Sequence, residues 1–450
     1  MKIVKSILTN RIPGQVVIQM TDRCNARCPQ CGMRATEKFT RSTLQTEKIK
    51  ETIDAAAEKG VAAVSFTGGE PLLDLDRLLE LIRYAGDAGI PFIRTGTNGF
   101  IFANSEKRGF EKRIERIAKQ LADTSLRNFW ISLDSAVDKV HEKMRGFSGI
   151  VAGMEKALPI FHENGIYPAA NLGINRNVGG RATRGLKRGA FASQGRYLEV
   201  FYARYQHALE RFYRRAIALG FTMANTCYPM SIDEEEEERG LAAVYAATTV
   251  EDVVRFDRME KQTLFKALIR AIERYRSKIR IFSPICSLEA LVRQYGDEAG
   301  HQAAYGCRGG VDFFFVNAAD GHTYPCGYRG AEDFGSLSQV TVDQLKPMAE
   351  GEACRQCDWE CFRDPSEMMG PLLEAFANPL GWTQRFSLRP RAIGTWFKDL
   401  AYYNACDLFD GRRPLNTSKL NRYALLFGRR EKKRDPLSEF SHLNKKLSVS

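Results

Sequence analysis

Three cysteines within eight residues constrain this chain more than any other feature. Cys24, Cys28 and Cys31 follow the apolar run 16–20, which predicts a β-strand leading into a cysteine-rich loop. Thiolates this close can hold three corners of an iron–sulfur cube and leave the fourth iron without a protein ligand. In catalytic metal sites, such an open position binds a substrate or cofactor. The alternatives are a structural zinc site with one ligand missing, or three unrelated thiols.

The remaining cysteines and the start of the chain indicate a reducing compartment. Eight of the 11 cysteines in the 450 residues fall into two clusters, and residues 1–5 begin no apolar signal segment. Clustered cysteines without a signal peptide favour metal binding over disulfides, so we expect a cytoplasmic protein. The longest uncharged apolar stretches, 60–69 and 240–250, are too short to span a bilayer.

Predicted strands and helices alternate along the first half of the chain. The strands are expected at 16–20, 61–66, 92–95, 129–133, 169–174 and 221–226, with amphipathic helices between them. This order predicts parallel βα units with right-handed crossovers. The fold class is therefore α/β, a partial (β/α)6 barrel of the TIM type, with its active site at the carboxyl ends of the strands.

Two further motifs follow predicted strands. Gly68-Gly69-Glu70 ends the second strand, and Ser132-Leu133-Asp134 ends the fourth, with Arg145-Gly146 shortly after it. Together with the CxxxCxxC spacing, these residues resemble the signature of the radical SAM enzymes. The resemblance implies a [4Fe–4S] cluster on Cys24, Cys28 and Cys31 whose open iron chelates S-adenosylmethionine (SAM).

The resemblance also implies which residues contact SAM. In the family, the Gly-Gly-Glu motif contacts the methionine amino group, so Gly68, Gly69 and Glu70 are expected to do so here. By the same likeness Ser132 would contact the ribose, Arg145 would pair with the carboxylate, and Asn171 on the next strand would help to hold the cofactor. Asp134 is expected to orient neighbouring groups, and His141 is as readily a surface histidine as a functional one. The chain departs from the family at Gln30, where an aromatic residue usually packs near the adenine.

A second cysteine region resembles the SPASM and twitch domains of the same family. Cys307, Gly321 and Cys326 have the spacing that opens such a domain, around a predicted β-hairpin over 313–324. Because four thiolates saturate one cluster, we expect one auxiliary [4Fe–4S] cluster. Its ligands are predicted from five cysteines, with Cys361 competing with Cys357 for the last place: Cys307, Cys326, Cys354, Cys357 and Cys361. A zinc ribbon of the same thiols is the alternative.

These patterns divide the chain into four predicted regions. They are a radical SAM core barrel at 1–235, a helical linker at 236–304, a twitch- or SPASM-like domain at 305–364, and a basic C-terminal extension with amphipathic runs at 365–450. The formal charge is +12, and residues 366–450 carry 15 Lys and Arg against 8 Asp and Glu. A basic tail favours anionic partners, although no nucleic-acid motif accompanies it.

Two features near the expected active-site face each allow two interpretations. The segment 176–196 contains six basic residues, five glycines and no acidic residue. It is either a lid over an anionic substrate or a solvated surface loop. Cys227, just after the sixth strand, is either a hydrogen-atom donor or, as is more common, a buried inert cysteine.

The sequence thus predicts a radical SAM enzyme, in which the cleavage of SAM yields a 5′-deoxyadenosyl radical that abstracts hydrogen from an unactivated C–H bond. The substrate is expected to be an anionic small molecule or a peptide, and the electron donor a flavodoxin or ferredoxin. A lipid-modifying enzyme that docks on the inner membrane face through 366–450 is one alternative. A metal-stabilised interaction protein is the non-enzymatic alternative. No catalytic residue is assigned.

Overall fold

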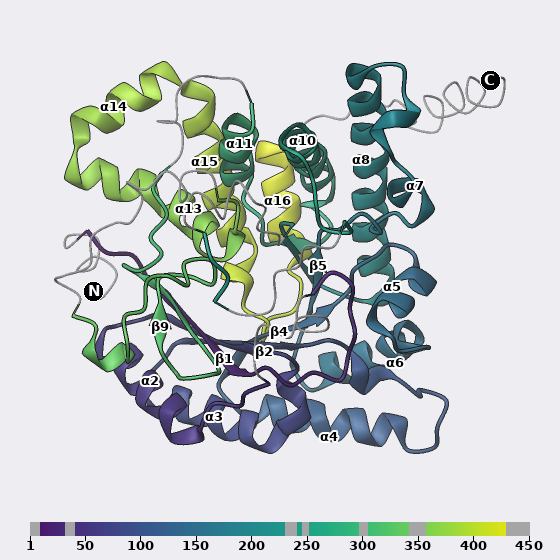
Figure 1. Cartoon of the computed structure of the whole chain (residues 1–450), viewed down its shortest axis with the longest axis vertical. Coiled ribbons are helices and arrows are strands. Elements are labelled where there is room, and N and C mark those ends of the chain that lie inside the picture. Colours follow the sequence, from purple (N-terminus) through teal and green to yellow (C-terminus); the bar gives the residue numbers. More distant parts are fainter. Residues whose placement is uncertain are drawn as a thin grey trace.

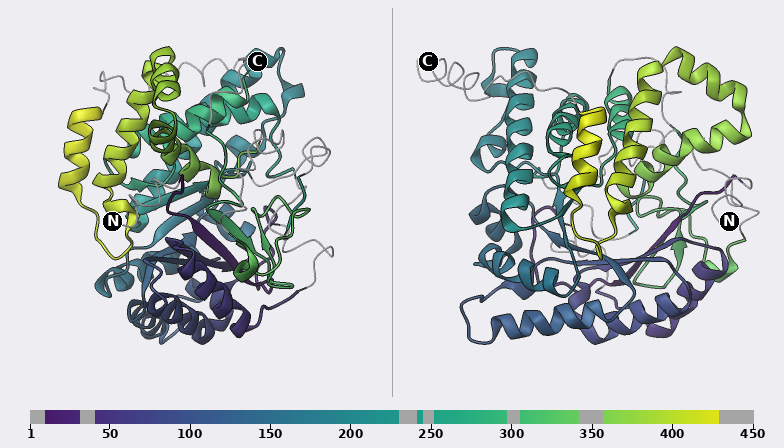
Figure 2. Two further views of the ribbon diagram at one scale, coloured as in Figure 1. Left: turned by 90° about the vertical axis from the view of Figure 1, so that its left-hand side faces the viewer. Right: turned by 180° about the vertical axis from the view of Figure 1, so that it is seen from behind.

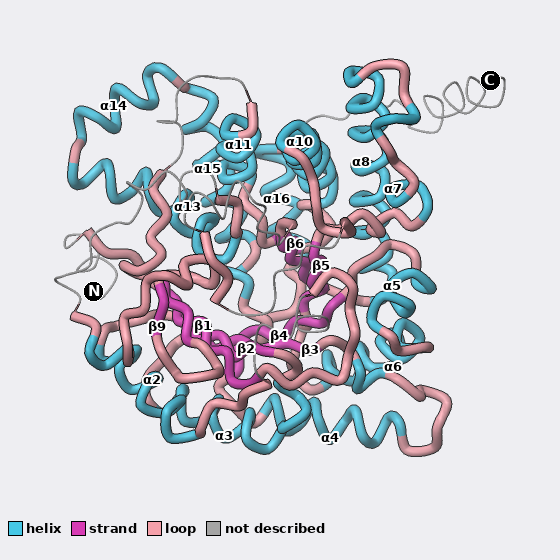
Figure 3. The backbone as a smooth tube through the Cα atoms, in the orientation of Figure 1, coloured by secondary structure: helices cyan, strands magenta, loops and turns pink. Residues whose placement is uncertain are grey.

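The strands form one curved sheet that contains both cysteine regions. The computed structural model describes residues 10–31, 41–229, 241–244, 252–296, 305–341 and 357–428. Nine strands lie in the order β7-β6-β5-β4-β3-β2-β1-β8-β9 (Figures 1 and 3). Their bounds are β1 Gln15–Thr21, β2 Ala63–Gly68, β3 Phe92–Thr97, β4 Leu126–Ser132, β5 Ala169–Gly173, β6 Met223–Cys227, β7 Arg280–Ile281, β8 Phe313–Val316 and β9 Thr323–Tyr324. All neighbours are parallel except β8 and β9.

Helices between the strands cover the outer face of the sheet. They are α2 Thr46–Glu58, α3 Leu75–Asp87, α4 Phe110–Ala122, α5 Asp138–Arg145, α6 Ile150–Glu163, α7 Arg181–Arg184 and α8 Gln194–Leu219. Alternate residues along each strand point outward into the main core, as Val64 and Phe66 do on β2. Figure 1 shows α2, α3 and α4 below the sheet and α5, α6 and α8 along one side. These layers are the expected βα units.

Helices α10 Arg258–Tyr275 and α11 Ile285–Gln294 continue the outer layer, because they are buried in the same core as α8. The later helices are α13 Glu360–Ala377, α14 Pro379–Leu388, α15 Pro390–Ala405 and α16 Thr417–Phe427 (Figure 2). Ala169 and Met223 on the inner face are buried in one cluster with Tyr402, Phe409 and Leu420. Gly411 exchanges backbone hydrogen bonds with Arg127 and Tyr167, both at 2.7 Å. The C-terminal extension, as far as residue 428, therefore closes the inner side of the barrel.

The sequence predicted this α/β barrel correctly. All six expected strands are present, and the hairpin of the second cysteine region is the antiparallel pair β8–β9. Two strands extend the sheet beyond the prediction: β7, inside the expected helical linker, pairs with β6, and β8 pairs with β1. The second cysteine region is thus an extension of the barrel sheet. No helix in the described ranges has the length and apolar character needed to cross a membrane.

Candidate active site

A pocket lies where the carboxyl ends of the parallel strands meet. Its volume is about 220 Å³, and residues from β2 to β6 and from the cysteine loop form its walls. The lining residues are Gln30, Cys31, Thr67, Gly68, Gly69, Glu70, Pro71, Gly96, Thr97, Asn98, Trp130, Ser132, Asp134, Arg145, Asn171, Gly173, Ile174, Cys227, Tyr228 and Val254. All six residues predicted to contact SAM are among them, as is Cys31.

Gly68 and Gly69 hold the cysteine loop against the second strand. The Gly69 N–H donates to the Thr21 carbonyl at 2.7 Å, and the Glu70 N–H donates to the Arg23 carbonyl at 2.8 Å. A Cβ at either glycine would lie 2.1 Å from a carbonyl oxygen of the loop backbone, and Gly68 also has a φ of +140°. Only glycine permits this approach. The glycines therefore position the loop that carries the first three cysteines.

The Cys24 and Cys28 thiols accept hydrogen bonds from side chains that line the pocket. Cys24 Sγ accepts from the Ala26 N–H at 3.4 Å and from Asn98 Nδ2 at 3.6 Å. Cys28, only 5% exposed, accepts from Arg145 Nη1 at 3.6 Å. Burial raises the pKa of the Cys28 thiol, and the charge of Arg145 offsets part of that rise. A cation beside a buried sulfur favours the thiolate form that binds metal.

Arg145 is fixed by Asp134 at the end of the fourth strand. Arg145 Nη2 and Nε donate to the two carboxylate oxygens of Asp134 at 2.8 and 2.5 Å. Burial favours the neutral form of Asp134, but Arg145 and His141 outweigh it and lower the pKa of Asp134 to about 2. His141 is fully buried, and its Nδ1 accepts from the Asp134 N–H at 3.1 Å, so the surface interpretation of His141 is wrong. Asp134 orients Arg145, as expected.

Glu70 is buried at the base of the pocket and already bonded to the backbone. One carboxylate oxygen accepts from the Leu72 N–H at 3.1 Å and the other from the Asn98 N–H at 2.5 Å. Burial raises the pKa of Glu70 to about 7 against these hydrogen bonds. A carboxylate has about four acceptor positions, and the Thr97 side chain also hydrogen-bonds to Glu70, so one position remains for a ligand.

Further polar side chains line the remainder of the pocket. Ser132 is buried on the wall, and Asn171 Oδ1 accepts from Asn225 Nδ2 at 2.8 Å and from the Cys227 thiol at 3.4 Å. The environment of Gln30 differs from those of Ser132 and Asn171. The amide nitrogen and oxygen of Gln30 are shielded from solvent and have no hydrogen-bond partner among the described residues. An amide in this state can bond to a ligand in the pocket.

Three thiols of the second cysteine region share one environment. The Sγ atoms of Cys307, Cys326 and Cys357 each accept the backbone N–H two residues further along, always at 3.4 Å. Cys24 accepts a hydrogen bond of the same kind. Neighbouring Cys326 and Cys307 add to the effect of burial in raising the pKa of the Cys357 thiol. Cys354 lies outside the described residues.

Cys361 packs against the same apolar cluster as Cys307 and Cys357. Its Sγ lies 3.6 Å from Glu360 Oε1, and its electrostatic neighbours include Glu360 and Asp364 of α13 and Arg94 of β3. The competition between Cys357 and Cys361 for the last ligand position stays a prediction. Sequence reasoning missed Glu360, whose second oxygen accepts from the Tyr228 N–H at 3.2 Å at the pocket edge. Its only sequence signal was its position next to a candidate ligand.

The basic segment 176–196 contacts other parts of the barrel and does not line the pocket. Arg176 donates to Glu260 at 2.6 Å and lies over the ring of Phe256. The exposed cations Arg181 and Arg184 form a short surface helix, and no basic residue of 176–196 is among those lining the pocket. The structure therefore places this loop as the surface-loop alternative describes.

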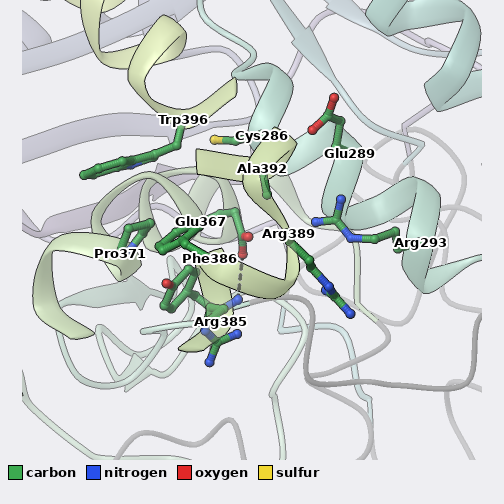
Figure 4. Close-up of a pocket in the computed structure, with 11 residues that line it drawn as sticks. Cys286, Glu289, Arg293, Glu367, Pro371, Arg385, Phe386, Arg389, Ala392 and Trp396 are labelled. Atoms are coloured by element: carbon green, nitrogen blue, oxygen red, sulfur yellow. Dashed lines mark hydrogen bonds between the residues drawn. The ribbon is translucent and has the colours of Figure 1, made fainter. Parts of the chain in front are cut away.

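A second hollow lies between α11, α13, α14 and α15 (Figure 4). Its volume is only about 30 Å³, enough for a few water molecules. Glu367 on its wall accepts the Tyr305 N–H at 2.8 Å, and Trp396 donates to the Met368 carbonyl. None of the motif residues reaches it, so the larger pocket is the candidate active site.

Comparison with known proteins identifies the domain that builds this pocket. Residues 18–179 match the family model described as the Radical SAM superfamily. Residues 18–179 of this chain therefore form a radical SAM domain. The matched segment runs from β1 past β5 and contains Cys24, Glu70 and Arg145. Members of this superfamily use a [4Fe–4S] cluster and SAM.

Curated relatives of this radical SAM protein are enzymes. It is 31% identical over 161 residues to Fe-coproporphyrin III synthase of Methanosarcina barkeri (strain Fusaro / DSM 804), covering 36% of this chain and 37% of that protein. It is 23% identical over 366 residues to AdoMet-dependent heme synthase of the same organism, covering 81% and 88%. GTP 3′,8-cyclase of Vibrio parahaemolyticus serotype O3:K6 (strain RIMD 2210633) is 30% identical over 155 residues, covering 32% and 42%. The chain thus spans less than half the length of the first and third relatives.

Solved structures include similar chains. Streptococcus suis SuiB bound to its precursor peptide SuiA aligns with a TM-score of 0.48 and 16% identity, covering 78% of this chain and 69% of that chain. The native anSMEcpe structure with bound AdoMet aligns with a TM-score of 0.47 and 15% identity, covering 85% and 99%.

The described residues fit the cofactors of the superfamily. The loop thiols lie beside Arg145 and Asn98 at the pocket, and the Gln30 amide on its wall has no hydrogen-bond partner among the described residues. In the described ranges, no three His, Cys, Asp or Glu side chains converge on a single metal ion. A four-iron cube differs from such a site because each thiolate binds a different iron.

Proposed function

We propose that this radical SAM protein reductively cleaves SAM and abstracts a hydrogen atom from an unactivated C–H bond of a small-molecule or peptide substrate. One observation carries the proposal. Three segments distant in sequence, the cysteine loop, Gly68-Gly69-Glu70 and the Asp134–Arg145 pair, converge on a single pocket. When bound, the cluster and SAM supply the electron transfer and the radical chemistry.

Each polar side chain of the pocket has a proposed task. Arg145 uses Nε and Nη2 on Asp134, and Nη1, which donates one N–H to Cys28, would offer its second N–H to the carboxylate of SAM. The acceptor position left on Glu70 would take the methionine ammonium group. Ser132 would contact the ribose, and Asn171 would border the substrate end of the pocket. These groups hold SAM in place while the enclosing strands exclude water.

The second cysteine region is proposed to hold an auxiliary cluster. The N–H···S hydrogen bonds of Cys307, Cys326 and Cys357 support this role, because such bonds tune cluster thiolates. Cys354 is proposed as the fourth ligand from its CxxC spacing with Cys357. We infer that this cluster passes electrons or fixes the substrate.

Anaerobic reconstitution followed by product analysis tests the proposal. With dithionite or reduced flavodoxin, the wild-type protein should convert SAM to 5′-deoxyadenosine, and Cys28→Ala should not. About eight irons per chain are expected if both clusters form, and about four if only the first does. Four irons with bound zinc would instead assign the second region to a zinc ribbon. Failure of the fully iron-loaded protein to cleave SAM would overturn the proposed function.

A tetrapyrrole substrate is a second, narrower candidate. It is favoured by the match to AdoMet-dependent heme synthase, which extends over 81% of this chain. A peptide is the competing class, because a PqqA peptide cyclase of Rhodopseudomonas palustris (strain ATCC BAA-98 / CGA009) is 30% identical over 138 residues. Mass spectrometry of extracts from cells with wild type or Cys28→Ala, in aqueous and lipid fractions, separates these classes. A changed lipid would instead support membrane docking through 366–450.

A further inference from the structure

Most of the exposed apolar side chains of this protein belong to its C-terminal helices. Ten large apolar side chains are exposed among the described residues, and eight of them lie between positions 376 and 427. These eight are Phe376, Leu380, Leu388, Phe397, Leu408, Leu425, Leu426 and Phe427. Exposed apolar residues are normal when they are scattered singly, but their concentration in one segment marks an interaction surface.

Helix α16 is apolar on two opposite sides. On its inner side, Leu420 is buried in the inner cluster of the barrel, and the ring centre of Tyr423 lies 5.0 Å from that of Tyr402. On its outer side, Leu425 and Leu426 are 88% and 69% exposed. A helix that packs on one side normally presents polar residues on the other. The two outer leucines therefore do not serve the packing of α16 against the barrel.

Basic side chains accompany these leucines. Arg422 lies three residues before Leu425 and four before Leu426, so the three side chains share the outer side of α16. On the neighbouring helix α15, Phe397 and Lys398 are also exposed. Figures 1 and 2 show α15 and α16 side by side, on the part of the molecule away from α3 and α4. We call these five residues the C-terminal face.

The exposed charge of this region is of one sign. Every exposed charged residue in 376–428 is basic, and Asp407 pairs with two of them, Arg413 and Lys419. The other three form no ion pair within the described ranges, and they are Arg391, Lys398 and Arg422. After α16 the sequence continues with five basic residues and one acidic residue at 429–434.

We propose that the C-terminal face docks on the surface of a bilayer that contains anionic lipid. Basic side chains interleaved with apolar ones match a surface on which negative headgroups cover hydrocarbon. A second copy of the chain fits less well, because a two-fold interface would set these like charges against each other. The leucines project from a helix and line neither of the two hollows, which suits a deformable lipid surface.

Vesicle flotation of the full chain tests the inference. The probes are vesicles of phosphatidylcholine alone and vesicles in which one third of the lipid is phosphatidylglycerol. Wild type should float with the mixed vesicles at low salt and not with phosphatidylcholine alone. High salt should weaken the binding, because it screens the attraction between the basic side chains and the headgroups.

Two double variants separate the apolar and the charged contributions. The leucine variant, Leu425→Ser/Leu426→Ser, should bind the mixed vesicles about tenfold more weakly or worse, because two leucines no longer enter hydrocarbon. The charge variant, Lys398→Gln/Arg422→Gln, should bind them about tenfold more weakly at low salt, because two cations near an anionic surface are lost.

Each variant has a matched control that should bind the mixed vesicles as wild type does. Leu73→Ser/Met259→Ser replaces the two exposed large apolar side chains outside 376–427. Lys112→Gln/Arg116→Gln replaces two exposed cations of α4.

The outcomes do not depend on SAM cleavage. Absence of wild-type binding to the mixed vesicles overturns the inference, as does equal binding by wild type and the leucine variant. Equal binding to both kinds of vesicle, or binding that high salt leaves unchanged, overturns the assignment to anionic lipid. A wild-type dimer in light scattering that the leucine variant abolishes would assign the face to a second copy instead. Should the leucine variant not fold, the charge variant carries the same comparison.

Discussion

At Gly69, an added methyl group would lie 2.1 Å from the Arg23 carbonyl oxygen. We expect Gly69→Ala to push the cysteine loop away from β2 and to prevent the first cluster from forming. The variant should lose about half of the eight irons expected per chain, together with SAM cleavage, and should keep the auxiliary cluster. Iron and sulfide analysis with electron paramagnetic resonance checks this. Gly394→Ala, with nothing within 4 Å of the new Cβ, is the control. A full iron content in Gly69→Ala would contradict this role of the glycine.

Gln30 offers a second prediction at this scale. Its side-chain amide has no partner in the part of the chain that the structure describes, and it lines the pocket together with Cys31. If this amide bonds to SAM, Gln30→Leu should weaken SAM binding about 3- to 10-fold, the usual worth of one hydrogen bond. Isothermal titration of the reconstituted protein measures the change. Gln206→Leu, whose amide bonds to Glu210 on α8, should bind SAM as wild type does. Equal affinities for all three proteins would show that the Gln30 amide does not contact SAM.

The sequence predicted residues of the pocket better than it predicted their contacts. Glu70 and Ser132 were found through a family resemblance whose motifs end predicted strands, and strand ends share one edge of the sheet; Arg145, on α5, was found through the same resemblance. The contact between Asp134 and His141 depends on which side chains meet in three dimensions. The spacing of residues along the chain does not predict such side-chain contacts.

At the scale of elements, Asp364 joins three of them. Its carboxyl group on α13 accepts from Ser287 of α11 at 2.6 Å and from the Tyr228 hydroxyl, next to β6, at 3.1 Å. Burial raises its pKa to about 8 despite these hydrogen bonds. A folded-state pKa above the unfolded value of 3.8 means that the folded state binds the proton more tightly. The contribution of Asp364 to the free energy of unfolding is therefore fully present below about pH 4 and is lost as the pH rises through 8.

This linkage predicts the behaviour of Asp364→Asn. Wild type should lose stability between about pH 4 and pH 8, and Asp364→Asn should lose less over that range, because its amide never ionises. Urea unfolding at several pH values measures both slopes. Asp54→Asn, on the exposed side of α2 where the carboxylate bonds to Tyr84, is the control and should keep the wild-type slope. The same slope in Asp364→Asn as in wild type would rule out Asp364 as its source.

Elements built from local patterns were predicted well, and those fixed by distant contacts were not. Helix α6 lies between the fourth and fifth strands, where an amphipathic helix was predicted, because its apolar spacing is strong. Strand β7 has two residues, too few for a periodic pattern. Strand β8 pairs with β1 across almost 300 positions of sequence, so the inclusion of the second cysteine region in the barrel sheet had no local signal.

At the scale of the molecule, the C-terminal helices complete the barrel. Helix α15 brings Tyr402, whose hydroxyl donates to the Ile279 carbonyl and accepts from the Ile281 N–H, both at 2.9 Å. The following turn supplies the carbonyls of Asp410 and Arg413 to Arg280. The sequence indicated amphipathic helices here but not the surface against which they pack, because their partners lie on strands more than 100 residues earlier.

Truncation separates the part of the extension that builds the fold from the rest. Ending the chain after Leu388 should unfold or aggregate the protein, because Ala169 and Met223 lose their cover and Arg280 loses two acceptors. Ending it after Gly428 should leave the thermal unfolding midpoint unchanged. Circular dichroism melts measure both.

A point substitution tests the same contact without shortening the chain. Tyr402→Phe should cost about 1–3 kcal/mol of unfolding free energy, because two buried backbone groups of the β7 segment lose their partner. Tyr84→Phe, which removes an exposed hydroxyl on α3, is the control and should cost little. If Tyr402→Phe and the chain ending at Leu388 both have the wild-type unfolding midpoint, α15 and α16 do not stabilise the barrel. If both are destabilised, the basic extension is part of the folded core, and any partner that binds it must use residues beyond 428 or the outer faces of α14 and α16.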